Sequence, residues 1–215
     1  MHRPLTGSLR CSPNPGCVTT NRLEAFSDGV LAVAITLLVL EIKVPAPGGH
    51  GTLAHALLAQ WPQYAAYVIS FVTIGIIWIN HHAMISRLRE ADRTILALNL
   101  LLLLTIGVLP FATDVMATYL KQNQGEHLAA AIYSGAFLLM SIAFISLNSH
   151  ILLSKSHLVG AELSLAQRRQ ILLRSATGVV PYLLATALAP VSPYITLGIC
   201  GAVAGYYALP VGSGG

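Results

Sequence analysis

The sequence predicts an all-α membrane protein with six transmembrane helices per chain. Of its 215 residues, 55% are hydrophobic and only 9% are charged, whereas about 25% are charged in an ordinary soluble domain. Long windows without Asp, Glu, Lys or Arg are the second observation, since a helix needs about 20 apolar residues to cross a bilayer. These windows are 61–80, 94–113, 128–153 and 175–215.

The first predicted helix, 23–44, carries an acidic residue inside the membrane. Twelve uncharged residues separate Asp28 from Glu41, and twelve helical residues rise about 18 Å, less than the roughly 30 Å of hydrocarbon. The helix therefore crosses only if it runs from about Arg22 to Lys43, which places Asp28 about 9 Å inside the Arg22 end. A carboxylate facing lipid there is costly, so we expect Asp28 to have a partner and this helix to be an inner helix.

The remaining helices follow from the other windows. Pro110 frees one backbone carbonyl and should kink the third helix. The last window is too long for one crossing, and the prolines of Ala189–Pro193 (APVSP) divide it with a tight turn. The predicted helices two to six are 61–84, 94–119, 128–154, 170–188 and 193–209.

The ends of the chain differ in composition from the 21–210 domain that holds the six helices. Residues 1–20 lack the apolar core of a signal peptide and are rich in Pro, Gly, Ser and Thr, which predicts a disordered tail. Residues 211–215 form a short C-terminal tail. With Cys11 and Cys17 in the first tail and Cys200 in the last span, we expect no disulfide and no metal site.

Basic residues fall mainly in the loops of one predicted face. Three arginines precede the first helix and three lie between the second and third, whereas the opposite face has only Lys43 and Lys121. By the positive-inside rule, both termini are cytoplasmic in a multi-pass protein of the cell membrane. The net charge of +4 requires no nucleic-acid partner, because lipid headgroups of the bilayer can neutralise arginines that flank the spans.

Polar residues of different helices should meet near that basic face. The topology brings Arg22 and Asp28 to the depth of His81 and His82, with Asn99 nearby. Arg22 and Asp28 are about 240° apart on an ideal helix, so a bridge from a second helix is favoured over a direct pair. We expect Asp28, Arg22 and one of the histidines to lock the first two helices together. Alternatively, the histidines only mark the headgroup boundary and Asp28 is hydrated.

Val33, Thr36, Leu37 and Leu40 fall on one face of the first helix. Periodicity does not single this face out, since the other faces are equally apolar. Such a stripe is more often packing than pore. The Thr36 hydroxyl is most simply bonded to a carbonyl of its own helix.

The motif R-x-x-x-F-S-D-G, formed by Arg22 and Phe26–Gly29 and followed by AITLLVLEIKVP, resembles the signature of the transmembrane protein 175 family. This family comprises endosomal and lysosomal potassium channels and prokaryotic homologues. The segments WINHH and NLLLLLTIGVLPFAT look like its second and third helices. The resemblance covers about half of the chain in motif and all of it in layout.

The resemblance implies a six-helix subunit and a homotetramer around a central pore lined by the first helix. Carried over, the pore positions are Val33, Thr36 and Leu40, with Leu37 close by. The family usually has a longer residue at Val33, so the narrowest layer is Val33, Leu37 or Leu40. The polar network expected from topology and resemblance together is Arg22, Ser27, Asp28, His81, His82 and Asn99.

We therefore expect a leak channel that is weakly to moderately selective for K⁺ over other monovalent cations and uses no cofactor. The K⁺ filter sequence T-V-G-Y-G is absent, so selectivity cannot come from a carbonyl cage of that kind. The resemblance instead implies an apolar constriction that gates by dewetting, where Thr36 hydroxyls supply partial replacement ligands. A secondary transporter is the main alternative, although only the third helix has a suitable proline. An intramembrane enzyme is less favoured, because neighbouring histidines point about 100° apart and no H-E-x-x-H or G-x-S-x-G accompanies them.

Overall fold

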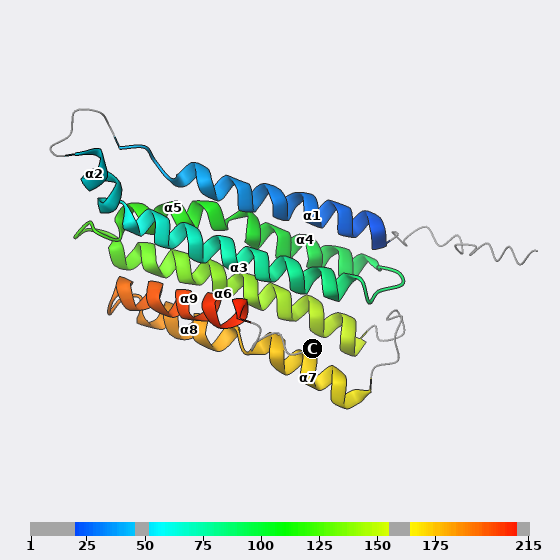
Figure 1. Cartoon of the computed structure of the whole chain (residues 1–215). Coiled ribbons are helices and arrows are strands. Elements are labelled where there is room, and N and C mark those ends of the chain that lie inside the picture. The colour runs from blue at the N-terminus through cyan, green and yellow to red at the C-terminus, as the bar shows by residue number, and fades with distance from the viewer. Residues whose placement is uncertain (1–19, 46–51, 155–163, 210–215) are drawn as a thin grey trace, which may run out of the picture.

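The computed structural model describes residues 20–45, 52–154 and 164–209, and in this part of the chain the helices run side by side in an elongated bundle (Figure 1). The all-α prediction is confirmed. Among the described residues, five segments are long and apolar enough to cross a membrane: Thr20–Glu41, Trp61–Ile85, Arg93–Tyr119, Glu126–Ser154 and Leu165–Leu188. The predicted tails are 1–20 and 211–215: residues 1–19 and 211–215 lie outside the described residues, while Thr20 already belongs to the first helix.

The first segment is an α-helix that tightens at its end. Helix α1 (Thr20–Leu37) continues as the 3₁₀ helix η1 (Leu38–Glu41), so it starts before the expected residue 23. One face packs against the bundle because its buried residues recur at helical spacing: Leu23, Ser27, Leu31, Ala34 and Leu38.

A short helix not expected from the sequence precedes the second span. Helix α2 (Leu53–Ala59) begins where the Thr52 hydroxyl accepts a hydrogen bond from the His55 N–H, 3.3 Å away. Such a cap satisfies one of the free amides at a helix start. Helix α3 (Trp61–Ile85) follows, with Pro62 in its first turn, where a missing N–H costs nothing.

Two of the spans are broken by proline. Helices α4 (Arg93–Gly107) and α5 (Leu109–Tyr119) meet at Val108. Pro110 has no N–H for the Ile106 carbonyl, which accepts from the Val108 N–H instead. Helices α7 (Leu165–Ala176) and α8 (Val179–Leu188) separate at 177–178, because Pro181 cannot donate to the Thr177 carbonyl. The predicted unbroken helix 170–188 is corrected accordingly: it starts earlier and is interrupted.

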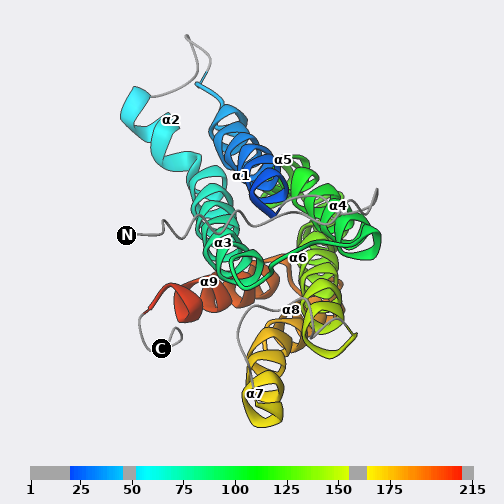
Figure 2. The same cartoon turned by 90° about the vertical axis from the view of Figure 1, so that its right-hand side faces the viewer.

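The centre of the bundle is α6 (Glu126–Ser149), which continues as the π-helix η2 (His150–Ser154). Among the five candidate spans, it buries the largest share of its residues. Figure 2 shows α6 between α4 and α8, while α1 lies at the edge of the bundle. The first helix, expected to be an inner helix, is therefore peripheral within a single chain.

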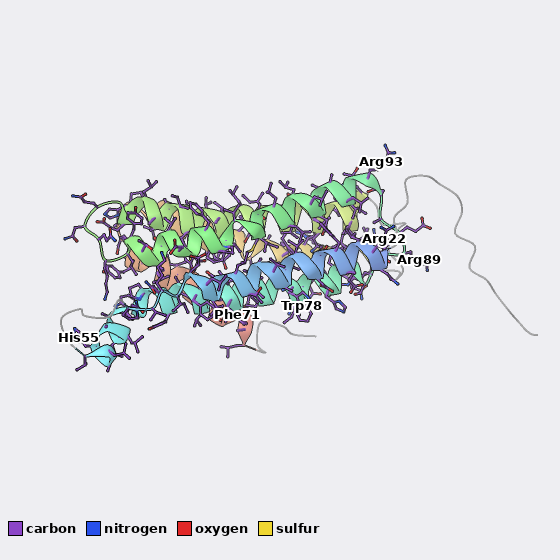
Figure 3. All side chains as sticks on the ribbon, turned by 90° about the horizontal axis from the view of Figure 1, so that it is seen from above. Arg22, His55, Phe71, Trp78, Arg89 and Arg93 are labelled. Atoms are coloured by element: carbon purple, nitrogen blue, oxygen red, sulfur yellow. The ribbon has the colours of Figure 1, made fainter. Side chains whose placement is uncertain are left out.

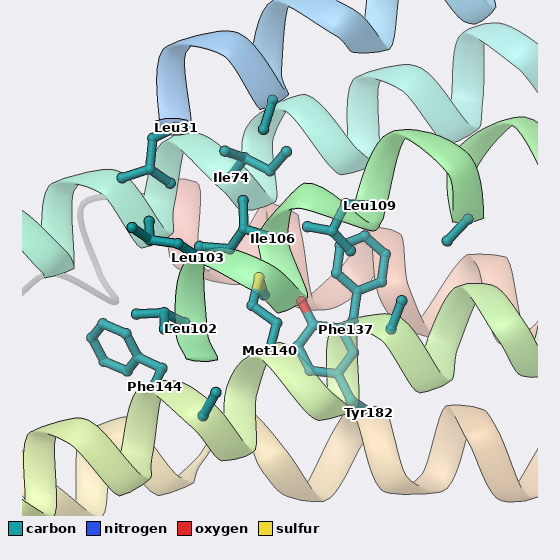
Figure 4. Close-up of a cluster of buried hydrophobic side chains, with 14 of the residues drawn as sticks. Leu31, Ile74, Leu102, Leu103, Ile106, Leu109, Phe137, Met140, Phe144 and Tyr182 are labelled. Carbon is teal, nitrogen blue, oxygen red and sulfur yellow. The ribbon is translucent and has the colours of Figure 1, made fainter. Parts of the chain in front are cut away.

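The core is a continuous apolar layer between α1, α3, α4 and α6, closed by α8 (Figure 4). Phe137 stands edge-on to Tyr133 and stacks on Tyr182, with ring centres 4.8 and 5.4 Å apart. Ser70, from α3, bonds through its hydroxyl to Thr113 (2.8 Å) and Tyr133 (3.2 Å). Lipid tails are as apolar as leucine, so close packing and hydrogen bonds of this kind hold helices together in a membrane.

The two ends of the bundle differ in charge. Figure 3 shows Arg22, Arg89 and Arg93 at one end, called here the basic end, and His55 at the other. Helix α9 (Pro193–Ala208) starts at the far end, where Ser192 caps it, and runs back toward the basic end. Its 16 residues rise only about 24 Å.

Candidate functional site

A buried chain of side chains joins three helices near the basic end. The Asn99 amide of α4 donates to the Ser27 hydroxyl of α1 at 2.9 Å, and the Asn99 carbonyl oxygen lies 2.8 Å from Nε2 of His81 of α3. All three residues are fully buried. Since the amide nitrogen is used toward Ser27, the oxygen must accept, which places the imidazole proton on Nε2. The chain therefore has one direction: His81 donates to Asn99, which donates to Ser27.

Two further contacts tie α1 to α3 beside that chain. The Trp78 indole N–H donates to Asp28 Oδ1 at 2.9 Å. One turn away, Glu24 Oε1 lies 2.6 Å from Nδ1 of His82. The two contact residues of α1 are four residues apart, and so are the two contact residues of α3. Because the helices are antiparallel, the two pairs match. Asp28 is half-buried, while Trp78 and His82 are exposed.

The structure brings together only part of the expected polar network. Ser27, His81 and Asn99 form one cluster, whereas Asp28 bonds to Trp78 instead of a histidine and His82 bonds to Glu24. Arg22 is exposed at the start of α1, six residues before Asp28, and does not bridge to it. The contact between the first two spans is therefore made by two predicted residues, Asp28 and His82, each bonded to a residue that the sequence prediction did not include, Trp78 and Glu24.

The predicted pore positions form an exposed stripe on α1. The exposed fractions of Val33, Leu37 and Leu40 are 58%, 42% and 70%, and Thr36 is exposed beside them. Phe26, seven residues before Val33, extends the stripe toward the basic end with 53% exposure. This apolar stripe lies opposite the buried face of α1, so the chain leaves it uncovered.

Thr36 is the polar member of the stripe. Its hydroxyl donates within its own helix, with the carbonyl oxygens of Ala32 and Val33 both 2.9 Å away. This is the local bond that the sequence predicts. Because the proton is used inside the helix, the lone pairs of the hydroxyl oxygen remain outward as acceptors. Thr36 can therefore offer an oxygen to a cation, but no proton.

The far end of the stripe is held by a clasp around Lys43. The Lys43 N–H donates to Gln63, and the Lys43 carbonyl accepts from Gln60, both across to the start of α3. The Lys43 ammonium lies 3.2 Å from Asp114 of α5. These bonds fix the position of η1 and thus of Leu40.

No three His, Cys, Asp or Glu side chains in the described part of the chain lie close enough to hold a metal ion.

Comparison with known proteins gives the family. A sequence model described as the endosomal/lysosomal potassium channel TMEM175 matches residues 22–110. A potassium channel of Streptomyces collinus is 46% identical over 188 residues, covering 87% of this chain and 91% of the relative. The chain belongs to the TMEM175 family.

Other TMEM175 relatives agree in sequence and in fold. A potassium channel of Chamaesiphon minutus is 39% identical over 88% of this chain and 94% of its own length. The crystal structure of a lysosomal potassium-selective channel TMEM175 homologue from the same organism superposes with a TM-score of 0.77 at 38% identity, covering 89% of this chain and 97% of that one. The match to the TMEM175 model contains α1 from Arg22 onward and every predicted pore and network residue.

Replacing Asp28 with alanine should reduce folding and assembly more than ion selectivity. Hydrogen bonds to charged groups contribute about 1.5–3 kcal/mol, and partial exposure lowers this to about 1 kcal/mol for the Asp28–Trp78 pair. The yield of assembled protein should therefore fall, while the K⁺ to Na⁺ permeability ratio of the assembled fraction stays unchanged.

Trp78→Phe is the matched variant, because it removes the indole N–H and keeps an aromatic ring. Unfolding in detergent of both single variants and the double variant measures the coupling between the two side chains. A double variant whose loss equals the sum of the single losses would show that the contact contributes nothing.

Proposed function

We propose that four copies of the chain associate around the exposed stripe of α1 to form a K⁺-permeable leak channel in the cell membrane. The observation that carries this proposal is the uncovered apolar stripe with Thr36 at its middle, within the segment that matches the TMEM175 model. Two relatives of nearly equal length carry the name potassium channel. In such a tetramer, α1 becomes the inner helix that the sequence predicts.

The proposed constriction consists of rings of Val33, Leu37 and Leu40. Four apolar side chains at one level exclude water, so an ion must shed hydration water to pass. K⁺ holds its hydration shell less tightly than Na⁺, which makes the barrier lower for K⁺. Other monovalent cations still pass, so selectivity is weak to moderate.

Thr36 lies between these apolar rings in sequence and supplies the one polar group of the stripe. Its outward lone pairs can replace part of the hydration shell that an ion loses beside Val33 or Leu37. A ring of four such oxygens stabilises a cation without binding it tightly. Thr36 thus contributes to ion selection as an acceptor.

The proposed orientation places the basic end in the cytoplasm, following the positive-inside rule. An even number of crossings then returns the C-terminus to the same side, with α9 as the sixth. The direction of α9, from the far end toward the basic end, supports this topology. Its short length requires local thinning of the bilayer or cover by neighbouring helices.

The test is a bi-ionic recording with purified protein in planar bilayers. A reversal potential that favours K⁺ over Na⁺ is expected for the wild type. Thr36→Val keeps the shape of the side chain and removes the oxygen, so it should lower the K⁺ to Na⁺ permeability ratio and leave the part that the apolar rings supply. Thr105→Val is the matched control, since Thr105 of α4 also donates to its own helix. Equal permeation of both ions by the wild type would refute this account of selectivity.

A secondary transporter is the second candidate. The observation that favours it is the pair of broken spans, at Val108 and at 177–178, because transporters often bind substrate at interrupted helices. Both breaks are explained by a local proline. Saturable uptake driven by an opposing ion gradient, without passive current, would decide for the transporter.

A further inference from the structure

Arg22 continues the line of the exposed stripe of α1 toward the basic end. Successive residues of a helix turn by about 100°, so Arg22 lies about 40° around the helix from Phe26 and about 20° from Val33. Along the axis, Arg22 stands about 16 Å beyond Val33. Its side chain is exposed at the basic end of the bundle (Figure 3). The face that contains the predicted pore positions therefore starts with a guanidinium.

The acidic residues of α1 do not neutralise this guanidinium. Glu24 lies about 160° and Asp28 about 120° around the helix from Arg22. Both carboxylates bond to side chains of α3 instead, at 2.6 and 2.9 Å. Arg22 itself has no hydrogen bond or ion pair with any residue that the structure describes. A helix is about 10–12 Å wide, which is about one screening length at 0.1 M salt, so the stripe side of the basic end is positive.

The far end of the stripe lacks a matching positive charge. The Lys43 ammonium lies 3.2 Å from Asp114, and this ion pair has no net charge. Glu41 directly follows Leu40 at the end of η1 and adds a carboxylate. The two ends of the stripe therefore differ in the sign of their charge.

We propose that Arg22 of each copy forms a positive ring at the cytoplasmic mouth of the pore, so that K⁺ enters more readily from the outside than from the cytoplasm. This inference rests on the proposed tetramer, in which four copies turn their stripes toward one axis. Charges of one sign around a mouth create a potential of several kT, so four guanidiniums at one level lower the local concentration of cations. Inward K⁺ current should therefore exceed outward current at equal and opposite voltages.

The ring acts on the direction of the current and not on ion selection. K⁺ and Na⁺ carry the same charge, so the repulsion at the mouth is equal for both ions. The first ring of the constriction, at Val33, lies about 16 Å deeper, beyond the screening length of about 10 Å at 0.1 M salt. Arg22 thus has a role that neither the apolar rings nor Thr36 fills.

The experiment is single-channel recording of the full-length protein in symmetrical KCl, in excised inside-out patches, which fix the orientation of the channel. At about 0.1 M KCl, the inward conductance of the wild type should be about twice the outward conductance. At about 1 M KCl, the screening length falls to about 3 Å and the two conductances should become nearly equal. Arg22→Gln should make them nearly equal at both salt concentrations, whereas Arg22→Lys should keep the wild-type difference. Neither variant should change the K⁺ to Na⁺ permeability ratio.

Arg169→Gln is the matched control, because Arg169 is exposed on α7, across the bundle from α1 (Figure 1). It should leave the wild-type difference unchanged. An equal change in Arg169→Gln, a difference that persists in Arg22→Gln or at high salt, or a larger outward conductance would overturn the inference and leave the proposed channel intact.

Arg22→Gln can also fail to assemble. The salt dependence of the wild type and of Arg22→Lys then decides, since both keep the positive charge. Lost assembly together with equal wild-type conductances at low salt would show that Arg22 bonds to a neighbouring copy instead of facing the mouth. A wild type that passes no current would overturn the proposed function together with this inference.

Discussion

Replacing Leu40 with alanine should increase the K⁺ current and reduce the preference for K⁺ over Na⁺. Leu40 is the most exposed of the three apolar stripe residues, at 70%, and the Lys43 clasp fixes its position. In the proposed tetramer, trimming four isobutyl groups to methyl groups widens a dewetted ring and lets water enter with the ion. If the barrier falls by about 1.4 kcal/mol, the conductance rises about tenfold. Single-channel recording of Leu40→Ala, Leu37→Ala and Val33→Ala identifies the narrowest layer as the one with the largest increase.

Leu104→Ala is the control for these pore variants, because Leu104 is 66% exposed but belongs to α4. It should leave conductance unchanged. Cysteines placed along α1 provide an independent check: Val33→Cys should react with an aqueous thiol reagent, and Leu31→Cys, which is buried against the bundle, should not. Reaction of Val33→Cys with lipid-phase probes alone would contradict the pore.

Replacing Asn99 with leucine should destabilise the folded chain by about 2–5 kcal/mol. Leucine has the same branched arrangement of heavy atoms, although it is larger, and it cannot accept from His81 or donate to Ser27. Each buried group left without a partner costs about 1–3 kcal/mol. The larger part of the loss should come from His81, since its Nδ1 already has no partner among the described residues and its Nε2 would lose the Asn99 oxygen. Ser27 keeps its bond to the Leu23 carbonyl at 2.8 Å. Chemical unfolding of the purified protein in detergent measures the loss.

The double variant Asn99→Leu with His81→Phe separates a lost hydrogen bond from poor packing. Replacing both partners by apolar groups of similar shape removes the unpaired imidazole, so part of the stability should return. Ser134→Ala is the reference for removing a buried hydroxyl, because Ser134 donates to Ala130 in its own helix. Equal stability of Asn99→Leu and the wild type would show that the buried chain does not hold α1.

The helices were predictable from hydropathy, whereas their ends and interruptions depend on local chemistry. Windows without charge locate each apolar run, but they do not show where a helix is interrupted. Pro181 interrupts the fifth span because its missing N–H leaves a carbonyl four residues earlier without its usual donor. The early start of α7 has a readable signal: Ser164 and Gln167 form a capping box, with bonds of 2.9 and 3.2 Å. A search for S-x-x-Q would have extended the predicted helix.

The sequence predicted the depth of the polar site residues in the membrane, but not which of them bond to one another. Topology alone puts Asp28, His81 and Asn99 at one level of the membrane, and the structure joins His81 to Asn99. Which of two adjacent histidines faces inward depends on the rotation of α3, which its sequence does not fix because large apolar residues occur on every face. The spacing in the sequence indicates the partners. Glu24 and Asp28 are four residues apart, as are Trp78 and His82, so on antiparallel helices both residues of one pair can contact both residues of the other.

Because α1 lies at the periphery of the bundle, its two faces meet different requirements. The face of this helix that packs inward determines whether the protein folds, whereas the outward face contributes little to the buried core. In the proposed channel, substitutions along the outward face therefore change permeation with little effect on the stability of the folded subunit. Natural variation can adjust conductance there residue by residue, without a compensating change elsewhere in the bundle.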